Sequence, residues 1–203
     1  MTETDATPVP LGRRERNKQQ KLERIIAAAD DLFGAHGVDE VTTQQIADAA
    51  DIGAGTLFLY AKNKAELLLL VQNKHYAEAI EAGSRASEAA SGCLNAVMAM
   101  IEPVIVCNRR QTENGRTYLR ELVFGDPEEP HHRAGLELIA RLDDAVVDIL
   151  VKTGELPRTD AGLLARAISA IMFVSLASPI HLRSTSEEIS ADIREQVGVL
   201  LRR

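Results

Sequence analysis

The sequence contains no tryptophan, and aromatic residues make up only 3% of its 203 residues. Hydrophobic residues still reach 45%, which is ample for a core, so the core must be built from leucine, isoleucine, valine and alanine. A chain rich in alanine and leucine favours helix. Strand-like alternation of useful length and internal repeats are both missing from the sequence. We therefore predict an all-α fold.

Membrane and export signals are also missing. No uncharged apolar run reaches 18 residues, and the polar N-terminus lacks an apolar signal region, so we expect a cytoplasmic protein with no membrane partner. Cys93 and Cys107 are the only cysteines. If one helix carries both, a rise of roughly 21 Å separates them, which is too far for an intrachain disulfide. We expect two reduced thiols.

The motifs of common enzyme and metal sites are absent as well. The chain has no Gly-x-Ser-x-Gly, no Cys-x-x-Cys and no His-Glu-x-x-His, and Gly53-x-Gly55 lacks the third glycine of a dinucleotide site. His131 and His132 stand beside acidic residues, but they lack a second spaced set of ligands. We predict no catalytic residues, no cofactor and no metal, and we leave open whether the His131–His132 loop binds anything.

What the sequence does contain is a pair of short helical patterns that meet at a tight turn, in residues 42 to 64. Thr42 and Gln45 have the spacing of a capping box at the start of the first helix. Gly53 tolerates the backbone that a sharp turn needs, and Leu57 is expected to face the core. This is a helix-turn-helix signature, in which the second helix enters the major groove of DNA.

At these residues the chain resembles the tetracycline-repressor (TetR) family of transcriptional regulators. The family pattern has Gly-Thr-Leu-aromatic-x-Tyr after the turn and Lys-Asn/Ser-Lys before a leucine-rich helix, and residues 52 to 64 match it in order. The resemblance covers roughly residues 20 to 70. Gly53 replaces the serine that usually caps the recognition helix, and Ala61 replaces a common phenylalanine. Because glycine is a tolerable cap, the first change costs only about a few tenths of a kcal/mol.

The net charge of −7 is unusual for a DNA-binding protein, but its distribution is not. Residues 11 to 24 contain six basic residues and two acidic ones, and Lys62 and Lys64 lie across the motif. Alone, such a run indicates a solvated face or a disordered tail. Beside a helix-turn-helix motif, it is suited to neutralising phosphates.

The pattern divides the chain into a disordered basic arm over residues 1–17, a helix-turn-helix domain over 18–65 and a helical segment over 66–203. The resemblance implies that this last segment is an effector-binding and dimerisation domain. The first helix is expected over 18–35, with Gly37 as a left-handed C-cap. About nine helices are predicted in all. The later ones are expected from Lys64 to Gly83–Ser84, over 87–108 with a kink or early end at Pro103, from the Asn114–Gly115 turn to Phe124, and over 136–154, 160–178 and 185–201.

The resemblance implies a set of residues that face DNA. Hydroxyls and the lysine would contact phosphates, Gln44 can pair with adenine, and small residues let the second helix approach base edges. For Phe58 and Tyr60, packing between helices is the competing interpretation. The predicted DNA-binding residues are Thr43, Gln44, Ala54, Gly55, Thr56, Phe58, Leu59, Tyr60 and Lys64.

The remainder of the chain resembles the family only in size and helix count. By resemblance, the last two long helices pair with those of a second subunit, and the homodimer reads a palindromic operator in double-stranded DNA. A small-molecule effector of unknown identity would change the separation of the two recognition helices and release a repressor. Four arginines, Arg109, Arg110, Arg116 and Arg120, could meet an anionic effector or form a solvated face. Candidate pocket residues, each with plain core packing as the alternative, are Met98, Ile101, Ile105, Tyr118, Phe124, Met172 and Phe173.

Two other functions stay open on sequence alone. A transcriptional activator of the same fold would share every motif above. A helical interaction module without DNA binding would leave the polar set around Gln44 and Lys64 without a role, and salt-dependent binding to duplex DNA would separate it from a regulator.

Overall fold

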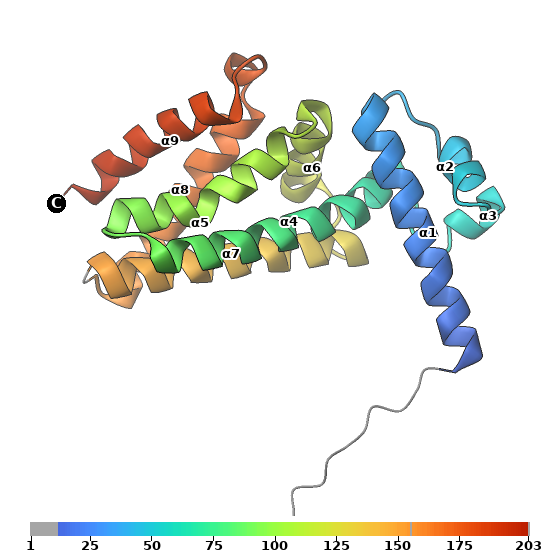
Figure 1. The fold of residues 1–203 in the computed structure, drawn as a ribbon, viewed down its shortest axis with the longest axis horizontal. Coiled ribbons are helices and arrows are strands. Elements are labelled where there is room, and N and C mark those ends of the chain that lie inside the picture. Colours follow the sequence, from blue (N-terminus) through green and yellow to red (C-terminus); the bar gives the residue numbers. More distant parts are fainter. Residues whose placement is uncertain (1–11, 155, 203) are drawn as a thin grey trace, which may run out of the picture.

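The computed structural model describes residues 12–154 and 156–202, and this part of the chain contains helices and no strand (Figure 1). The predicted all-α fold is confirmed. The nine α-helices and one 3₁₀ helix are α1 (Arg13–His36), α2 (Thr43–Ala49), α3 (Ala54–Leu57), α4 (Lys64–Ala89), α5 (Cys93–Arg109), α6 (Thr112–Phe124), α7 (Pro130–Gly154), α8 (Arg158–Ala177), η1 (Pro179–His181) and α9 (Ser186–Leu201).

A small N-terminal unit is built from α1, α2, α3 and the start of α4 (Figure 1). Its core contains Ile25, Phe33, Ile46 and Leu57, each no more than 1% exposed, and Leu67 of α4 closes it. Because α4 belongs to this core and continues into the larger domain, it contributes side chains to the cores of both domains.

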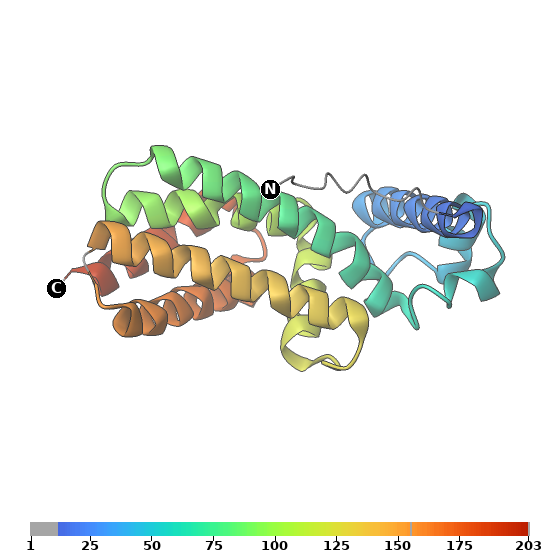
Figure 2. The same ribbon diagram turned by 90° about the horizontal axis from the view of Figure 1, so that it is seen from below.

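The larger domain is a bundle in which α4, α5 and α7 lie lengthwise beside one another (Figure 2). The other helices, α6, α8 and α9, complete a second, separate core of aliphatic side chains and two tyrosines. The last helix begins with the predicted capping box: the Thr185 hydroxyl accepts from the Glu188 N–H at 3.2 Å, and the Glu188 carboxylate accepts from the Thr185 N–H at 2.9 Å.

The predicted boundary of the N-terminal arm is wrong in part. Residues 1–11 lie outside the described residues, but α1 begins at Arg13 rather than at residue 18. Residues 13–17 continue the helix because straight-chain charged residues lose little side-chain freedom in a helix, and the Arg16 N–H already donates to the Gly12 carbonyl. Gly37 does end α1 with a positive φ of 79°, but its ψ of 155° lies outside the left-handed helical region.

Three predicted breaks in the larger domain are also corrected. Gly83 and Ser84 do not end α4, which runs on to Ala89, because Gly83 is a contact point: a Cβ there would lie 2.1 Å from the Met100 carbonyl oxygen. The next helix starts at Cys93 instead of residue 87, and it continues through Pro103 to Arg109. These glycine and proline signals concern helix packing more than helix ends.

Asn114 and Gly115, predicted as a turn, lie in the first two turns of α6. The side-chain amide of Asn114 is hydrogen-bonded to backbone groups of the N-terminal unit. Gly115 lies against α5, where a Cβ would be 2.1 Å from the Asn108 carbonyl oxygen. Both residues are buried, so tertiary contact overrides their turn preference.

Among the described residues, α8 is long and apolar enough to cross a membrane by length and composition alone. In the fold it packs on α7, and Ala161, Ala165 and Ile168 are buried in the core of the larger domain. Its other side carries exposed Leu163 and Val174. A helix that packs along one side and is apolar on the other is expected at a subunit interface.

Candidate DNA interface and effector cavity

The first helix of the helix-turn-helix is held by the capping box predicted from the sequence. The Thr42 hydroxyl accepts from the Gln45 N–H at 3.2 Å, and the Gln45 side-chain oxygen accepts from the Thr42 N–H at 2.8 Å. Ile46 and Ala47 face the core and are fully buried. The cap therefore sets where α2 starts and which of its faces stays outside.

The turn between α2 and α3 uses a different residue from the one predicted. Asp51 has the positive φ, 53°, whereas Gly53 has φ −69° and ψ 142° and stands at the N-cap of α3 without a side-chain bond. Aspartate tolerates the left-handed region better than most residues. Its carboxylate also meets Arg24 of α1 at 3.3 Å, which ties the turn to α1.

The outer surface of α3 is small and apolar. Leu57 is buried, as predicted, while Phe58 and Leu59 just beyond it are 48% and 82% exposed. Gly55 is exposed, and a Cβ there would meet nothing within 4 Å. Ala54 and Thr56 are half-buried beside it. Apolar side chains of this size standing in solvent are suited to close contact with base edges and thymine methyl groups.

The polar residues of the predicted interface lie on α2 and at its start. Gln44 is exposed, and its amide donates to the Asp48 carboxylate at 2.7 Å. Thr43, at the first position of α2, is half-buried. Gln44 must leave Asp48 before it can pair with a base, so its base contact would replace one hydrogen bond with another.

Tyr60 and Lys64 both contact the rest of the small domain. The Tyr60 hydroxyl lies 3.4 Å from the Lys18 carbonyl of α1, so the packing interpretation and the phosphate-contact interpretation both apply to this residue. The Lys64 ammonium donates to the Asp39 carbonyl at 3.2 Å. Neither residue forms an ion pair with a carboxylate among the described residues, so the charge of Lys64 stays available to a phosphate.

Lys62, in contrast, is engaged by the larger domain. Its ammonium forms an ion pair with Glu129 in the turn between α6 and α7. The hydrogen bond and the charge of Glu129 raise the pKa of Lys62. This ion pair is one of several direct contacts between the recognition segment and the α6–α7 turn.

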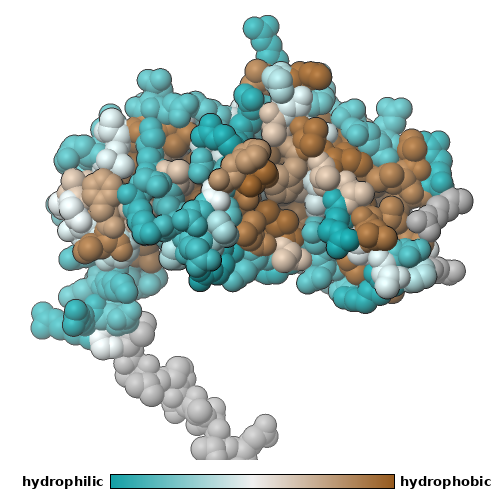
Figure 3. All heavy atoms as spheres, turned by 180° about the vertical axis from the view of Figure 1, so that it is seen from behind, coloured by the Kyte–Doolittle hydropathy of each residue, from teal (hydrophilic) through white to brown (hydrophobic). Residues whose placement is uncertain are grey.

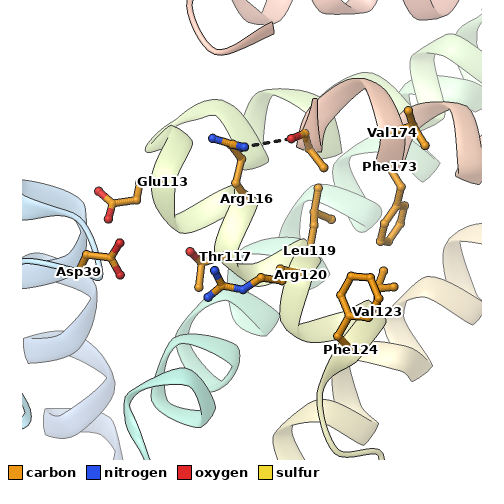
Figure 4. Close-up of a pocket in the computed structure, with 11 residues that line it drawn as sticks. Asp39, Glu113, Arg116, Thr117, Leu119, Arg120, Val123, Phe124, Phe173 and Val174 are labelled. Carbon is orange, nitrogen blue, oxygen red and sulfur yellow. Dashed lines mark hydrogen bonds between the residues drawn. The ribbon is translucent and has the colours of Figure 1, made fainter. Parts of the chain in front are cut away.

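A pocket of about 480 Å³ opens where α6, α8 and the loop after α1 meet (Figure 4). Asp39 and Glu113 lie at the end near the small domain, and loss of solvent, followed by contact with Asp39, raises the pKa of Glu113. Arg116, which donates to the Ala177 carbonyl at 3.2 Å, and Arg120 lie between this acidic end and an apolar end. The apolar end contains Val123, Phe124, Phe173 and Val174.

Behind Leu119 and Phe173, which also line this pocket, lies a second cavity whose wall exposes only apolar atoms. Its free volume is about 10 Å³, which is at the lower limit for a single water molecule. The wall includes Tyr76, Tyr118 and Met172. An effector can enter this cavity only if these side chains move.

The predicted ligand residues divide into two groups. Tyr118, Phe124, Met172 and Phe173 line one or both of these cavities. Met98, Ile101 and Ile105 are at most 5% exposed, line neither, and pack in the main core, so for them the core interpretation holds in this conformation. Sequence alone could not separate the two groups because all share the same helical spacing.

The four arginines are likewise divided. Arg116 and Arg120 line the pocket, whereas Arg109 donates to three carbonyls around η1, His181, Leu182 and Ser184. Burial, and then the nearby charge of Arg116, lower the pKa of Arg109. No acidic or histidine cluster suitable for a metal occurs in the part of the chain that the structure describes.

The start of α7 supplies contacts that the sequence did not reveal. His131 accepts a side-chain hydrogen bond at its carbonyl from Asn73 (2.8 Å), and its ring Nε2 lies 2.8 Å from the Tyr60 carbonyl. The neighbouring His132 is buried, with both ring nitrogens unpartnered in the structure. Asn73 stands in a polar stretch of α4, between Gln72 and Lys74, so the sequence around it gave no distinguishing signal.

Comparison with known proteins agrees with this geometry. Residues 25–71 match the model of "Bacterial regulatory proteins, tetR family". The chain is 23% identical over 184 residues to the HTH-type transcriptional repressor KstR of Mycobacterium tuberculosis, covering 91% of this chain and 82% of that protein.

Solved structures share the fold along nearly the whole chain. A TetR transcriptional regulator from Rhodococcus sp. RHA1 has a TM-score of 0.69 at 17% identity and covers 92% of this chain and 98% of its own. Thermus thermophilus FadR, a transcriptional repressor solved with lauroyl-CoA, has a TM-score of 0.67 at 23% identity. The match covers 89% of this chain and 92% of the FadR chain.

The fold and the site together define a helix-turn-helix protein with a helical regulatory domain. Residues 25–71 match the tetR family of bacterial regulatory proteins, and the chain shares its fold with solved TetR-family regulators.

Proposed function

We propose that this protein is a sequence-specific, DNA-binding transcriptional repressor that a small-molecule effector releases from its operator. The observation that carries the proposal is the surface of the helix-turn-helix. A capped α2 and a short α3 present Gln44, Gly55, Phe58 and Leu59 to solvent, with Lys64 beside them. Exposed apolar side chains next to a cation that bonds no carboxylate fit base edges flanked by phosphates. Its work would take place in the cytoplasm.

The repressor would act as a homodimer through α8 and α9. Leu163 and Val174 on α8 and Val199 on α9 are 60%, 69% and 59% exposed, and apolar side chains gather on the face that carries α8 (Figure 3). Exposed apolar side chains on two neighbouring helices favour a self-complementary, two-fold interface. Such a dimer would present two recognition helices about 34–36 Å apart to a palindromic operator.

The effector would bind at the pocket between α6 and α8. Because this pocket lies in the larger domain, the chain would divide into an N-terminal DNA-binding domain and a larger effector-binding domain. Guanidinium groups, an apolar end and the closed apolar cavity behind it favour a ligand with an apolar body and a negatively charged end. The lauroyl-CoA named in the Thermus thermophilus FadR structure is a ligand of this kind. We therefore propose an acyl thioester or a similar anionic amphiphile as the effector class.

Selection of duplex DNA from a random library by the purified protein tests the DNA-binding function. Gly55→Glu and Gly55→Lys are run in parallel with wild type, because a side chain at Gly55 meets no neighbour and the two variants differ mainly in charge. We expect wild type to enrich a palindrome, Gly55→Glu to lose it, and Gly55→Lys to retain affinity for duplex DNA. Equal binding by the two variants would contradict the placement of α3 at DNA, and no enrichment by folded, dimeric wild type would overturn the function.

A further inference from the structure

We propose that a chain of three hydrogen bonds, from Tyr118 through Asn73 and His131 to Tyr60, transmits the state of the effector cavity to the recognition segment. This proposal rests on the proposed function, because it identifies how that cavity would regulate DNA binding. It makes Asn73 and His131 positioning residues, which act on DNA only through Tyr60. The chain links three helices of the larger domain to the end of the helix-turn-helix.

The chain of hydrogen bonds begins in the wall of the cavity. Tyr118 is fully buried, lines the closed apolar cavity, and stacks against Tyr76 with ring centroids 4.3 Å apart. Its hydroxyl donates to the Asn73 side-chain oxygen at 2.8 Å. The cavity wall exposes no polar atom, so the position of the Tyr118 hydroxyl depends on Asn73.

Asn73 uses both ends of its amide. While its oxygen accepts from Tyr118, its nitrogen donates to the His131 carbonyl at 2.8 Å, near the start of α7. Gly135, one turn further along α7, permits this approach: a Cβ there would lie 2.5 Å from Leu122 Cδ2 and 3.1 Å from Asn73 Oδ1. Because both ends are engaged, a shift of the Tyr118 hydroxyl must either break a bond or move the His131 backbone.

The last bond reaches the DNA-binding unit. The His131 ring nitrogen Nε2, as donor, lies 2.8 Å from the Tyr60 carbonyl, one turn beyond α3. The ion pair between Lys62 and Glu129 joins the same two segments and keeps them adjacent. Tyr60 and Lys64, two predicted DNA contacts, flank this junction. A displacement of His131 therefore changes the position of the recognition surface.

The closed cavity explains why the chain would respond to a ligand. With only about 10 Å³ free, an apolar group that passes Leu119 and Phe173 must displace part of the wall. Tyr118 is adjacent to Leu119 on α6, so displacing Leu119 moves the hydroxyl that starts the chain. Losing that bond would leave a polar group of Asn73 unpaired, and restoring it requires rearrangement of the amide.

Spatial continuity alone does not establish coupling, so the test measures local opening. Amide hydrogen exchange is followed by mass spectrometry on the DNA-free dimer of wild type, Tyr118→Phe and Asn73→Leu, with Tyr76→Phe as the matched control. Tyr76→Phe removes a hydroxyl from the same cavity wall, but that hydroxyl accepts from Asn108 instead of Asn73. Peptides from α9 report whether a variant merely loosens the whole fold.

We expect Tyr118→Phe and Asn73→Leu to speed exchange of the peptide covering residues 57–64 by about 5-fold or more, the lower range of measured coupling between sites. Exchange in α9 and in the Tyr76→Phe control should stay at the wild-type rate. Wild-type exchange at 57–64 in both variants would overturn the proposal, and so would an equal increase in all regions or in the control. The hydrogen-exchange measurement requires neither DNA nor effector.

Operator affinity supplies the second readout, on the palindrome selected by wild type. Each single variant should weaken binding about 5-fold or more, and the double variant should be no weaker than the worse single variant, because both changes break one chain. Additive losses would contradict a single chain. If wild type binds no operator, the proposed function fails, while the exchange measurement still decides whether the chain couples cavity and recognition segment.

Discussion

The side-chain amide of Asn114 on α6 spans the two domains: its oxygen accepts from the Val38 N–H at 2.7 Å, and its nitrogen donates to the Phe33 carbonyl at 2.8 Å. All three residues are buried. Phe33 and Val38 flank Gly37, where α1 ends, so Asn114 completes the hydrogen bonding of that helix end from another domain. It lies one turn before Tyr118, which places the interdomain bonds of Asn114 and the start of the hydrogen-bond chain to Tyr60 on the same helix.

Asn114→Ala should lower the free energy of unfolding by about 2–3 kcal/mol, because it leaves the buried Val38 N–H without an acceptor. The Phe33 carbonyl keeps its bond from the Gly37 N–H at 3.0 Å, so the loss comes mainly from Val38. Urea denaturation at neutral pH measures the change.

The matched control is Asn17→Ala, an exposed asparagine on α1. We expect its unfolding free energy to stay within about 0.5 kcal/mol of wild type. Equal stability of Asn114→Ala and Asn17→Ala would show that the interdomain bonds contribute nothing net.

Local signals predicted the helix-turn-helix well. Thr42 and Gln45 form the capping box that their spacing indicated, and Leu57 faces the core. Such features depend on residues three or four apart, so they can be read directly along the chain. The positive φ of Asp51 was missed because a glycine two residues later is the better sequence candidate for a turn.

The helix ends and turns predicted at glycine and asparagine residues were wrong where these residues contact distant parts of the chain. Gly83 and Gly115 mark close approaches to α5, and Asn114 bonds to a segment 76 residues away. Glycine and asparagine have strong turn preferences when considered alone. A tertiary partner reverses this preference, and nothing local reveals that partner.

Pocket residues were predictable only as a class. Tyr118 and Ile105 are both buried apolar residues on helical stripes, yet only Tyr118 lines a cavity. The distinction depends on how α6, α7 and α8 pack, which periodicity does not determine. Asn73 and His131 were not predicted as functional because their roles exist only through each other.

Gln44→Ala should change base preference at one position of each operator half-site and leave the other positions unaltered. Gln44 is exposed and held only by Asp48, so it can turn toward an adenine at the cost of one hydrogen bond. Binding to operators substituted at each position measures the preference, with an expected loss of about 1–3 kcal/mol of discrimination at one position. An unchanged profile would remove Gln44 from base reading.

Lys64→Ala should weaken binding to all duplex sequences by a similar factor and lower the salt slope by about one unit per contacted phosphate site. The Lys64 ammonium bonds a carbonyl and no carboxylate, so its charge is free for a phosphate. Lys152→Ala, at the far end of α7, is the control. Titrations at several salt concentrations give the slope, and identical slopes for both variants would exclude the contact.

Val174→Arg should convert the dimer to a monomer, because it places a charge on the exposed apolar face of α8. Light scattering should then give a mass near 22.1 kDa instead of about twice that value. Val106→Arg is the matched control, since Val106 is an exposed valine on α5. A dimeric Val174→Arg, or a monomeric Val106→Arg, would place the interface elsewhere.

Cys107 should resist alkylation in the folded protein. Burial raises the pKa of its thiol to about 11, so at pH 8 only about one molecule in a thousand carries the reactive thiolate. In the unfolded chain, with an ordinary pKa near 8.5, the fraction rises to about one in four. Because folding favours the protonated thiol, its contribution to stability is present below about pH 8.5 and is lost as the pH rises toward 11. Iodoacetamide labelling of a Cys93→Ser variant isolates this thiol. We expect labelling at pH 8 to be roughly 100-fold faster in urea than in buffer, and equal rates would show that the Cys107 thiol is neither buried nor shifted.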